Sequence, residues 1–153
     1  MSERRKRIEA AIHRYLLLFK PENTASTLRD ITMALDDLVR VYFDTPEVEP
    51  DTIDELDAPR FNEAAFGQNA ARFFERDDVI WLIDPEGGPD QEAMCTFATS
   101  ELTEIAADLT RVLWAFENGS EADAIWEFRF GYQAHWGDHL HRVRHYLHGL
   151  AAW

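Results

Sequence analysis

The chain has 153 residues, 46% of them hydrophobic, and a formal net charge of −14. This length and apolar content suit one domain with a sizeable core. The negative charge repels phosphates and acidic lipid surfaces, so it argues against direct binding of nucleic acid or of a membrane.

Apolar residues recur at three- and four-residue steps in the first part of the chain, which predicts amphipathic helices. The first helix is expected over residues 3–20 and ends before Pro21. The second is expected over residues 26–43, with Ser26 as its N-cap. The connector at residues 44–59 holds three prolines and seven acidic residues, and we expect it to be solvated because it is too charged to pack.

A shorter helix is expected over residues 60–76. The segment D-V-I-W-L-I-D-P, residues 78–85, has no evident strand to pair with, so we expect an irregular turn there. Two longer helices follow over residues 100–117 and 121–150, with Ser100 and Ser120 as N-caps. The pattern predicts an all-α fold, a single-domain bundle of about five helices.

The last predicted helix carries five of the six histidines. On a helical projection of about 100° per residue, its apolar stripe runs through Trp136. His135 and His139 lie one turn apart at the border of this stripe, so they share a face of the helix. The other three lie on the far, solvent side, where side chains of one convex surface seldom converge on an ion: His141, His145 and His148.

An i, i+4 histidine pair can present two ligands to a divalent metal. The preceding helix carries carboxylates on an edge beside its apolar stripe, and an antiparallel helix pair would bring them to the histidines. Two interpretations stay open. One is a His–Asp hydrogen bond that joins the helices, which the lack of an E-x-x-H or H-E-x-x-H signature favours. The other is a divalent-metal site, the one cofactor considered, with these ligands: His135, His139, Asp108 and Glu104.

When the projection is continued backward from Trp136, Arg129 and Gln133 fall on the apolar stripe. A buried guanidinium needs a partner, so Arg129 either pairs with an acid of the preceding helix or forms the polar floor of a ligand pocket. The expected lining of such a pocket is Arg129, Gln133, Trp126, Trp136 and Trp81.

The order of residues in the second half has a family likeness. An aromatic run ending at Pro85 precedes a helix with Glu104 and Asp108, then Trp126, then H-W-G-D-H at 135–139. Over residues 78–150 this order resembles a family of small bacterial helical proteins described as a domain of unknown function, with an H-W-G-x-H segment in the last helix. The resemblance implies a helical fold and no activity. Glu101 follows Ser100 where that family is expected to have paired aspartates, which counts against a metal on this helix.

The chain contains no nucleophile elbow, P-loop, dinucleotide fingerprint or zincin motif. We therefore expect a non-enzymatic interaction or regulatory module whose acidic surface engages a basic protein partner, as a monomer or homodimer. The alternative is a small divalent-metal-dependent enzyme or sensor that uses the histidine pair. The single cysteine, Cys95, and the lack of a signal-like apolar segment predict a cytoplasmic location.

Overall fold

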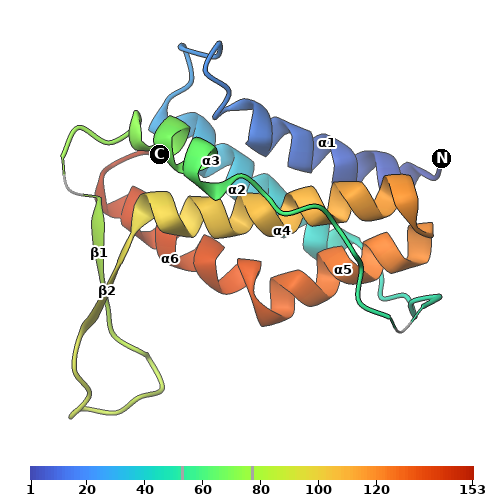
Figure 1. Cartoon of the computed structure of the whole chain (residues 1–153). Helices are drawn as coiled ribbons and strands as arrows, with labels where there is room; N and C mark the ends of the chain where they lie inside the picture. Colours follow the sequence, from blue (N-terminus) through green and yellow to red (C-terminus); the bar gives the residue numbers. More distant parts are fainter. Residues whose placement is uncertain (53, 77) are drawn as a thin grey trace.

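The computed structural model describes residues 1–52, 54–76 and 78–153; Ile53 of the acidic connector and Asp77 lie outside the described residues. Within the described ranges the chain forms six helices and two short strands (Figure 1). In chain order they are α1 (Glu3–Leu17), α2 (Leu28–Asp44), α3 (Glu63–Ala71), β1 (Val79–Leu82), β2 (Met94–Phe97), α4 (Ala98–Asn118), α5 (Glu121–Ala134) and α6 (Trp136–Gly149).

Helix α4 is the centre of the bundle, because it packs against α1, α3, α5 and α6 (Figure 1). Apolar residues along α4 are fully buried, among them Leu102, Ile105 and Leu109. Helices α1 and α2 pack on each other, and Tyr15 of α1 donates a hydrogen bond from its hydroxyl to the main-chain oxygen of Leu102 at 2.8 Å. This arrangement confirms the predicted helical fold and leaves one face of α4 for polar residues.

Side chains fix where the helices begin. Thr27, one residue after the predicted Ser26, is the N-cap of α2 and forms a capping box with Asp30. Helix α4 begins at Ala98, before the predicted Ser100, and its N-cap offers no side-chain bond. The carboxylate of Asp78 accepts from the main-chain nitrogen of Thr99 at 2.9 Å instead, so the residue before β1 satisfies this helix end.

The segment at residues 78–85 differs from the expected irregular turn. Its residues Val79–Leu82 form β1 and pair antiparallel with β2, with Trp81 opposite Cys95. The hairpin projects away from the helices (Figure 1). Because β2 is therefore largely exposed, its sequence shows no pattern of buried apolar residues. The prediction was wrong because β2 has only four residues and leads directly into α4.

The predicted helix over 121–150 is broken at His135, whose φ of −148° and ψ of −79° are not helical. Two glycines allow the close packing at this break because they have no side chain. A side-chain carbon on Gly137 would lie 2.1 Å from the main-chain oxygen of Tyr132, and one on Gly131 would lie 2.7 Å from the ring of Trp136. Trp136 thereby enters the core fully buried. Helices α5 and α6 therefore do not share one projection.

Candidate functional site

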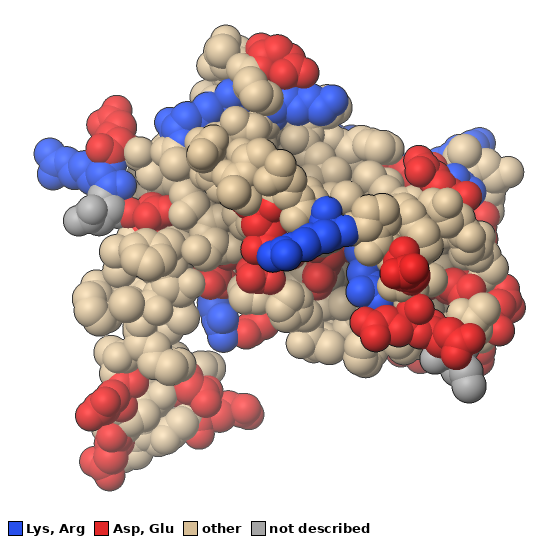
Figure 2. Space-filling view, in the orientation of Figure 1, with Lys and Arg blue, Asp and Glu red and all other residues tan. Residues whose placement is uncertain are grey.

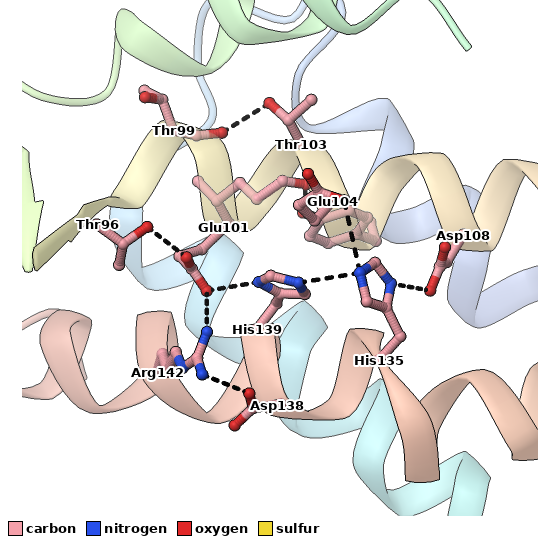
Figure 3. A network of polar contacts seen from close by, with 12 residues as sticks. Thr96, Thr99, Glu101, Thr103, Glu104, Asp108, His135, Asp138, His139 and Arg142 are labelled. Carbon is pink, nitrogen blue, oxygen red and sulfur yellow. Dashed lines mark hydrogen bonds and ion pairs between the residues drawn. The ribbon is translucent and has the colours of Figure 1, made fainter. Parts of the chain in front are cut away.

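The two histidines at the α5–α6 junction face three carboxylates of α4 (Figure 3). His135 is the residue at the break, and His139 lies one turn into α6. Because α4 packs against both α5 and α6, residues spaced three and four apart along α4 are brought to this junction. These carboxylates belong to Glu101, Glu104 and Asp108.

Each histidine uses its Nδ1 atom on a different carboxylate. His135 Nδ1 lies 2.7 Å from Asp108 Oδ2. His139 Nδ1 lies 2.7 Å from Glu101 Oε2. An ionised carboxylate only accepts hydrogen bonds, so each Nδ1 carries the hydrogen and donates it. In a neutral ring the other nitrogen, Nε2, then presents a lone pair.

The Nε2 atoms of His135 and His139 face each other at 3.2 Å. With the hydrogens on Nδ1, two lone pairs would point at one another, so a positive species must lie between them. That species is either a proton, which makes one ring an imidazolium, or a metal ion. Glu104 completes the group, because its Oε2 lies 3.7 Å from His135 Nε2 and the ligand atoms of all three residues lie within 4.8 Å of one another.

The arrangement fits a small divalent ion. Two imidazole nitrogens bound to zinc at a tetrahedral angle lie about 3.4 Å apart, and the observed separation between His135 and His139 is 3.2 Å. The Glu104 side chain is 45% exposed, so a change of rotamer can bring its carboxylate closer. The predicted residues thus come together, with one difference in role: Asp108 holds the ring of His135 through Nδ1, as carboxylates beside metal-bound histidines do.

Glu101 was left out of the predicted site, yet it belongs to this cluster. Its side chain is 4% exposed and accepts from His139 and from the hydroxyl of Thr96 at 2.5 Å. Burial would raise the pKa of Glu101, but the hydrogen bonds from His139 and Thr96 outweigh burial and lower it. The hydrogen bond to Glu101 raises the pKa of His139. The spacing of Glu101, Glu104 and Asp108 along one helix edge was the signal that could have identified it.

A cavity of about 580 Å³ opens beside this cluster. His135 and Asp108 form part of its lining, so the cavity reaches the histidine pair. The other walls come from α4, from α5 and from the acidic connector, which crosses this side of the bundle (Figure 1). The main-chain nitrogen of Thr52 donates to Asp123 at 2.9 Å, and this contact fixes the connector against α5. It also lowers the pKa of Asp123.

Of the five residues predicted to line a ligand pocket, three line a small cavity of about 200 Å³ together, namely Trp126, Arg129 and Gln133, whereas Trp136 and Trp81 lie elsewhere. Trp136 is fully buried, and its Nε1 donates to the main chain of α5 at 3.2 Å. Trp81 is 72% exposed on the hairpin, whereas Trp126 lines the cavity on α5. The amide of Gln133 donates to the hydroxyl of Tyr42 at 2.9 Å. Trp136 was wrongly grouped with the α5 residues because the projection was continued through the break between α5 and α6.

Of the two alternatives for Arg129, pairing with an acid of α4 is not found in the part of the chain that the structure describes; Arg129 instead caps α2 and lines the small cavity with Trp126 and Gln133. Its Nη1 donates to the main-chain oxygens of Tyr42, at 3.1 Å, and of Thr45. Its guanidinium also lies 4.7 Å from the centre of the Tyr42 ring and 3.4 Å from a carboxylate oxygen of Glu47. Arg129 thus joins α5 to the end of α2, where free carbonyl groups attract a cation.

The remaining histidines of α6 are exposed, as the projection predicted. His141 contacts the hydroxyl of Tyr132 through Nε2 at 2.8 Å. The ring of His148 lies 6.5 Å from that of Trp153. Neither contact brings a histidine toward the cluster at the α5–α6 junction, so these residues provide matched controls for experiments on it.

Comparisons with known proteins concern the family and the fold. The model of a family described as Domain of unknown function (DUF5063) matches residues 44–152. A crystal structure of protein BF1032 from Bacteroides fragilis matches with a TM-score of 0.69 at 13% identity, covering 97% of this chain and 92% of that chain. No curated protein matches this chain. In the residues that the structure describes, every helix is too short or too polar to cross a membrane.

Proposed function

This chain belongs to the DUF5063 family, whose description assigns no activity, and we propose from the geometry of its site that it binds one divalent transition-metal ion. The proposed ligands are His135 Nε2, His139 Nε2 and a carboxylate oxygen of Glu104. The protein is then a small metal-dependent enzyme or sensor.

One observation carries this proposal: two histidine Nε2 atoms point at each other at 3.2 Å while both Nδ1 atoms are bonded to carboxylates. A proton between the rings would be stabilised by Glu104 only at a distance of 3.7 Å, whereas a metal ion at this point would take the Glu104 carboxylate as a third ligand. Arg142, 3.8 Å from Glu101, offsets part of the charge of the three carboxylates, and a divalent ion would neutralise the remainder more fully than one proton does.

The donor set indicates which ions to test. Two imidazoles and one carboxylate are ligands of catalytic zinc, and they also suit iron(II). Three protein ligands leave coordination positions for water or a small molecule. A bound ion of this kind lowers the pKa of water and polarises carbonyl or phosphoryl oxygens. Since His135 lines the adjacent cavity, a small molecule there would be close to the ion.

The direct test is a titration of metal-free protein with Zn²⁺ and with Co²⁺, followed by calorimetry and by the visible absorption of cobalt. We expect one ion to bind per chain. We expect its affinity to fall at least about tenfold in His139→Ala and in Glu104→Gln. His145→Ala, an exposed histidine of the same helix, is the matched control and should bind as the wild type does. Binding that is equal in all four proteins, or absent from the wild type, would overturn the proposal.

A second candidate function, engagement of a basic protein partner, is supported by the hairpin. Its exposed apolar residues include Trp81, Ile83 and Met94. Acidic residues gather at its tip: Asp84, Glu86, Asp90 and Glu92 (Figure 2). An apolar stem with an acidic end is the complement of a basic surface with an apolar centre.

Photo-crosslinking tests this second function. A photoreactive residue at position 83 should capture a cationic protein, whereas one at Met33, exposed on α2, should not. The same products from both positions would count against a hairpin-specific partner.

A further inference from the structure

The cavity beside the histidine pair contains an arginine and a glutamate that are poorly satisfied by the protein. Arg111 of α4 and Glu127 of α5 both line it. Their closest approach, Arg111 Nε to Glu127 Oε2, is 3.5 Å, which is at the outer limit of a hydrogen bond. Two opposite charges that line a cavity without forming a close ion pair can each bind a ligand group of the other sign.

Arg111 has donors to spare. Its Nε is buried and has no hydrogen-bond partner among the described residues. Its other ionic contact within the described ranges, from Nη2 to Glu55, is 3.8 Å long and ends on a side chain that is 86% exposed. Buried guanidinium nitrogens are almost always paired, and a planar guanidinium binds a carboxylate through two parallel hydrogen bonds. Arg111 is therefore prepared to receive a carboxylate group.

Glu127 is the opposite half of the pair. Its side chain is 19% exposed, and burial raises its pKa even though Arg111 is near. The ionised form of a partly buried carboxylate is stabilised by a hydrogen-bond donor that carries a positive charge. A ligand ammonium group would provide both the charge and the hydrogen bonds that the protein leaves unmade.

The cavity also has an apolar side. Trp126 and Phe130, one turn apart on α5, stack with ring centres 4.6 Å apart and an interplanar angle of 9°. Leu56 of the connector lines the same space. Flat aromatic walls with a few polar groups are typical of small-molecule sites, and a volume of about 580 Å³ is within their usual range.

We infer that this cavity binds a small zwitterion, an amino acid with an apolar side chain, with its carboxylate on Arg111, its ammonium on Glu127 and its side chain against Trp126 and Phe130. The ammonium and carboxylate of an amino acid lie about 3 Å apart, which matches the 3.5 Å between the two protein charges. A simple anion would meet Glu55 and Asp108, and a simple cation would meet Arg111, so each alone binds less well. The inference rests on the proposed function in one respect only: a ligand bound in this cavity would lie close to the proposed metal ion.

Three probes separate these possibilities by calorimetry on the full chain: L-phenylalanine, phenethylamine, which lacks the carboxylate, and 3-phenylpropanoate, which lacks the ammonium. We expect phenylalanine to bind at least about tenfold more tightly than either fragment. Phenethylamine binding as tightly as phenylalanine would overturn the inference in favour of a cation site. Equal binding of 3-phenylpropanoate would overturn it in favour of an anion site, and no binding of phenylalanine would overturn it outright.

Two variants assign the contacts. Arg111→Gln should reduce phenylalanine binding to the level of phenethylamine, and Glu127→Gln should reduce it to the level of 3-phenylpropanoate. Arg60→Gln, an exposed arginine before α3, is the matched control and should leave phenylalanine binding unchanged. Phenylalanine binding that survives both cavity variants, in protein whose circular dichroism is that of the wild type, would contradict the assignment.

The same titrations on metal-free and zinc-loaded protein distinguish this inference from the proposed function. Zinc binding without phenylalanine binding would leave the metal site standing and remove the zwitterion. Phenylalanine binding without any zinc binding would do the reverse. The expected result is that both bind and that the metal-free protein still prefers phenylalanine to the fragments.

Discussion

Replacing Glu101 by glutamine tests the charge on which the histidine cluster depends. The substitution keeps the shape of a side chain that is 4% exposed and contacts His139 and Thr96. It removes the charge that strengthens these hydrogen bonds. Hydrogen bonds to a charged group contribute about 1.5–3 kcal/mol, against about 1 kcal/mol for neutral pairs. We therefore expect Glu101→Gln to cost about 1–2 kcal/mol of unfolding free energy in metal-free protein at pH 5.5, or roughly 2–8 °C in Tm.

The pH dependence of this loss follows from the two pKa shifts. The pKa of Glu101 is lowered from 4.5, so its contribution to stability is present above pH 4.5 and is lost as pH falls through the folded pKa. The pKa of His139 is raised from 6.5, so its contribution is present below pH 6.5 and is lost as pH rises through the folded pKa. The difference between wild type and variant should be largest between these values.

Urea denaturation with a chelator, from pH 4 to pH 9, measures this profile. Glu104→Gln is the control, because its carboxylate is half-exposed and 3.7 Å from the nearest histidine nitrogen. A loss for Glu101→Gln that is the same at every pH, or no loss at pH 5.5, would refute the proposed ionic hydrogen bond.

Three further predictions follow from the same contacts. Gly137→Ala should lower the free energy of unfolding, measured by urea denaturation, by about 1–3 kcal/mol, because the added carbon would lie 2.1 Å from a main-chain oxygen. Gly149→Ala, whose added carbon would have nothing within 4 Å, should change it by less than about 0.5 kcal/mol. Equal effects of the two substitutions would contradict the tight α5–α6 junction. Arg129→Gln should lower the free energy of unfolding by about 2–3 kcal/mol in the same assay, because the end of α2 loses its charged hydrogen-bond donor. An unchanged urea midpoint would contradict the role of Arg129 as a cap. Zinc should displace a proton from the cluster at pH 6.5, because the pKa of His139 is raised; calorimetry in two buffers of different ionisation enthalpy would detect it, and identical heats would exclude it.

Much of the helical architecture could be predicted because it depends on local patterns. Apolar residues at helical spacing and capping residues such as Ser120 are properties of a few neighbouring positions. The hairpin and the helix break depend on contacts that are not local. β1 needs a four-residue partner located after an irregular loop, and the break at His135 depends on the close approach of Gly137 to Tyr132.

The candidate site illustrates the same difference. His135 and His139 could be identified because they are one turn apart, and the face of α4 that meets them followed from the carboxylate spacing. Glu101 was missed because a departure from the family pattern was given more weight than its position on that face. The suggested α4 partner of Arg129 was wrong for a different reason: the angle of Arg129 was counted through a break that periodicity does not reveal.

The metal content of untagged protein tests the central claim most directly. Mass spectrometry of native wild-type protein should find about one equivalent of a transition metal, and His135→Ala/His139→Ala should lose it. His141→Ala/His145→Ala, a pair with the same spacing on the exposed face of α6, should retain the ion. Absence of an ion from the wild type after purification with metal supplied, or an equal content in both double variants, would contradict a metal site at the α5–α6 junction.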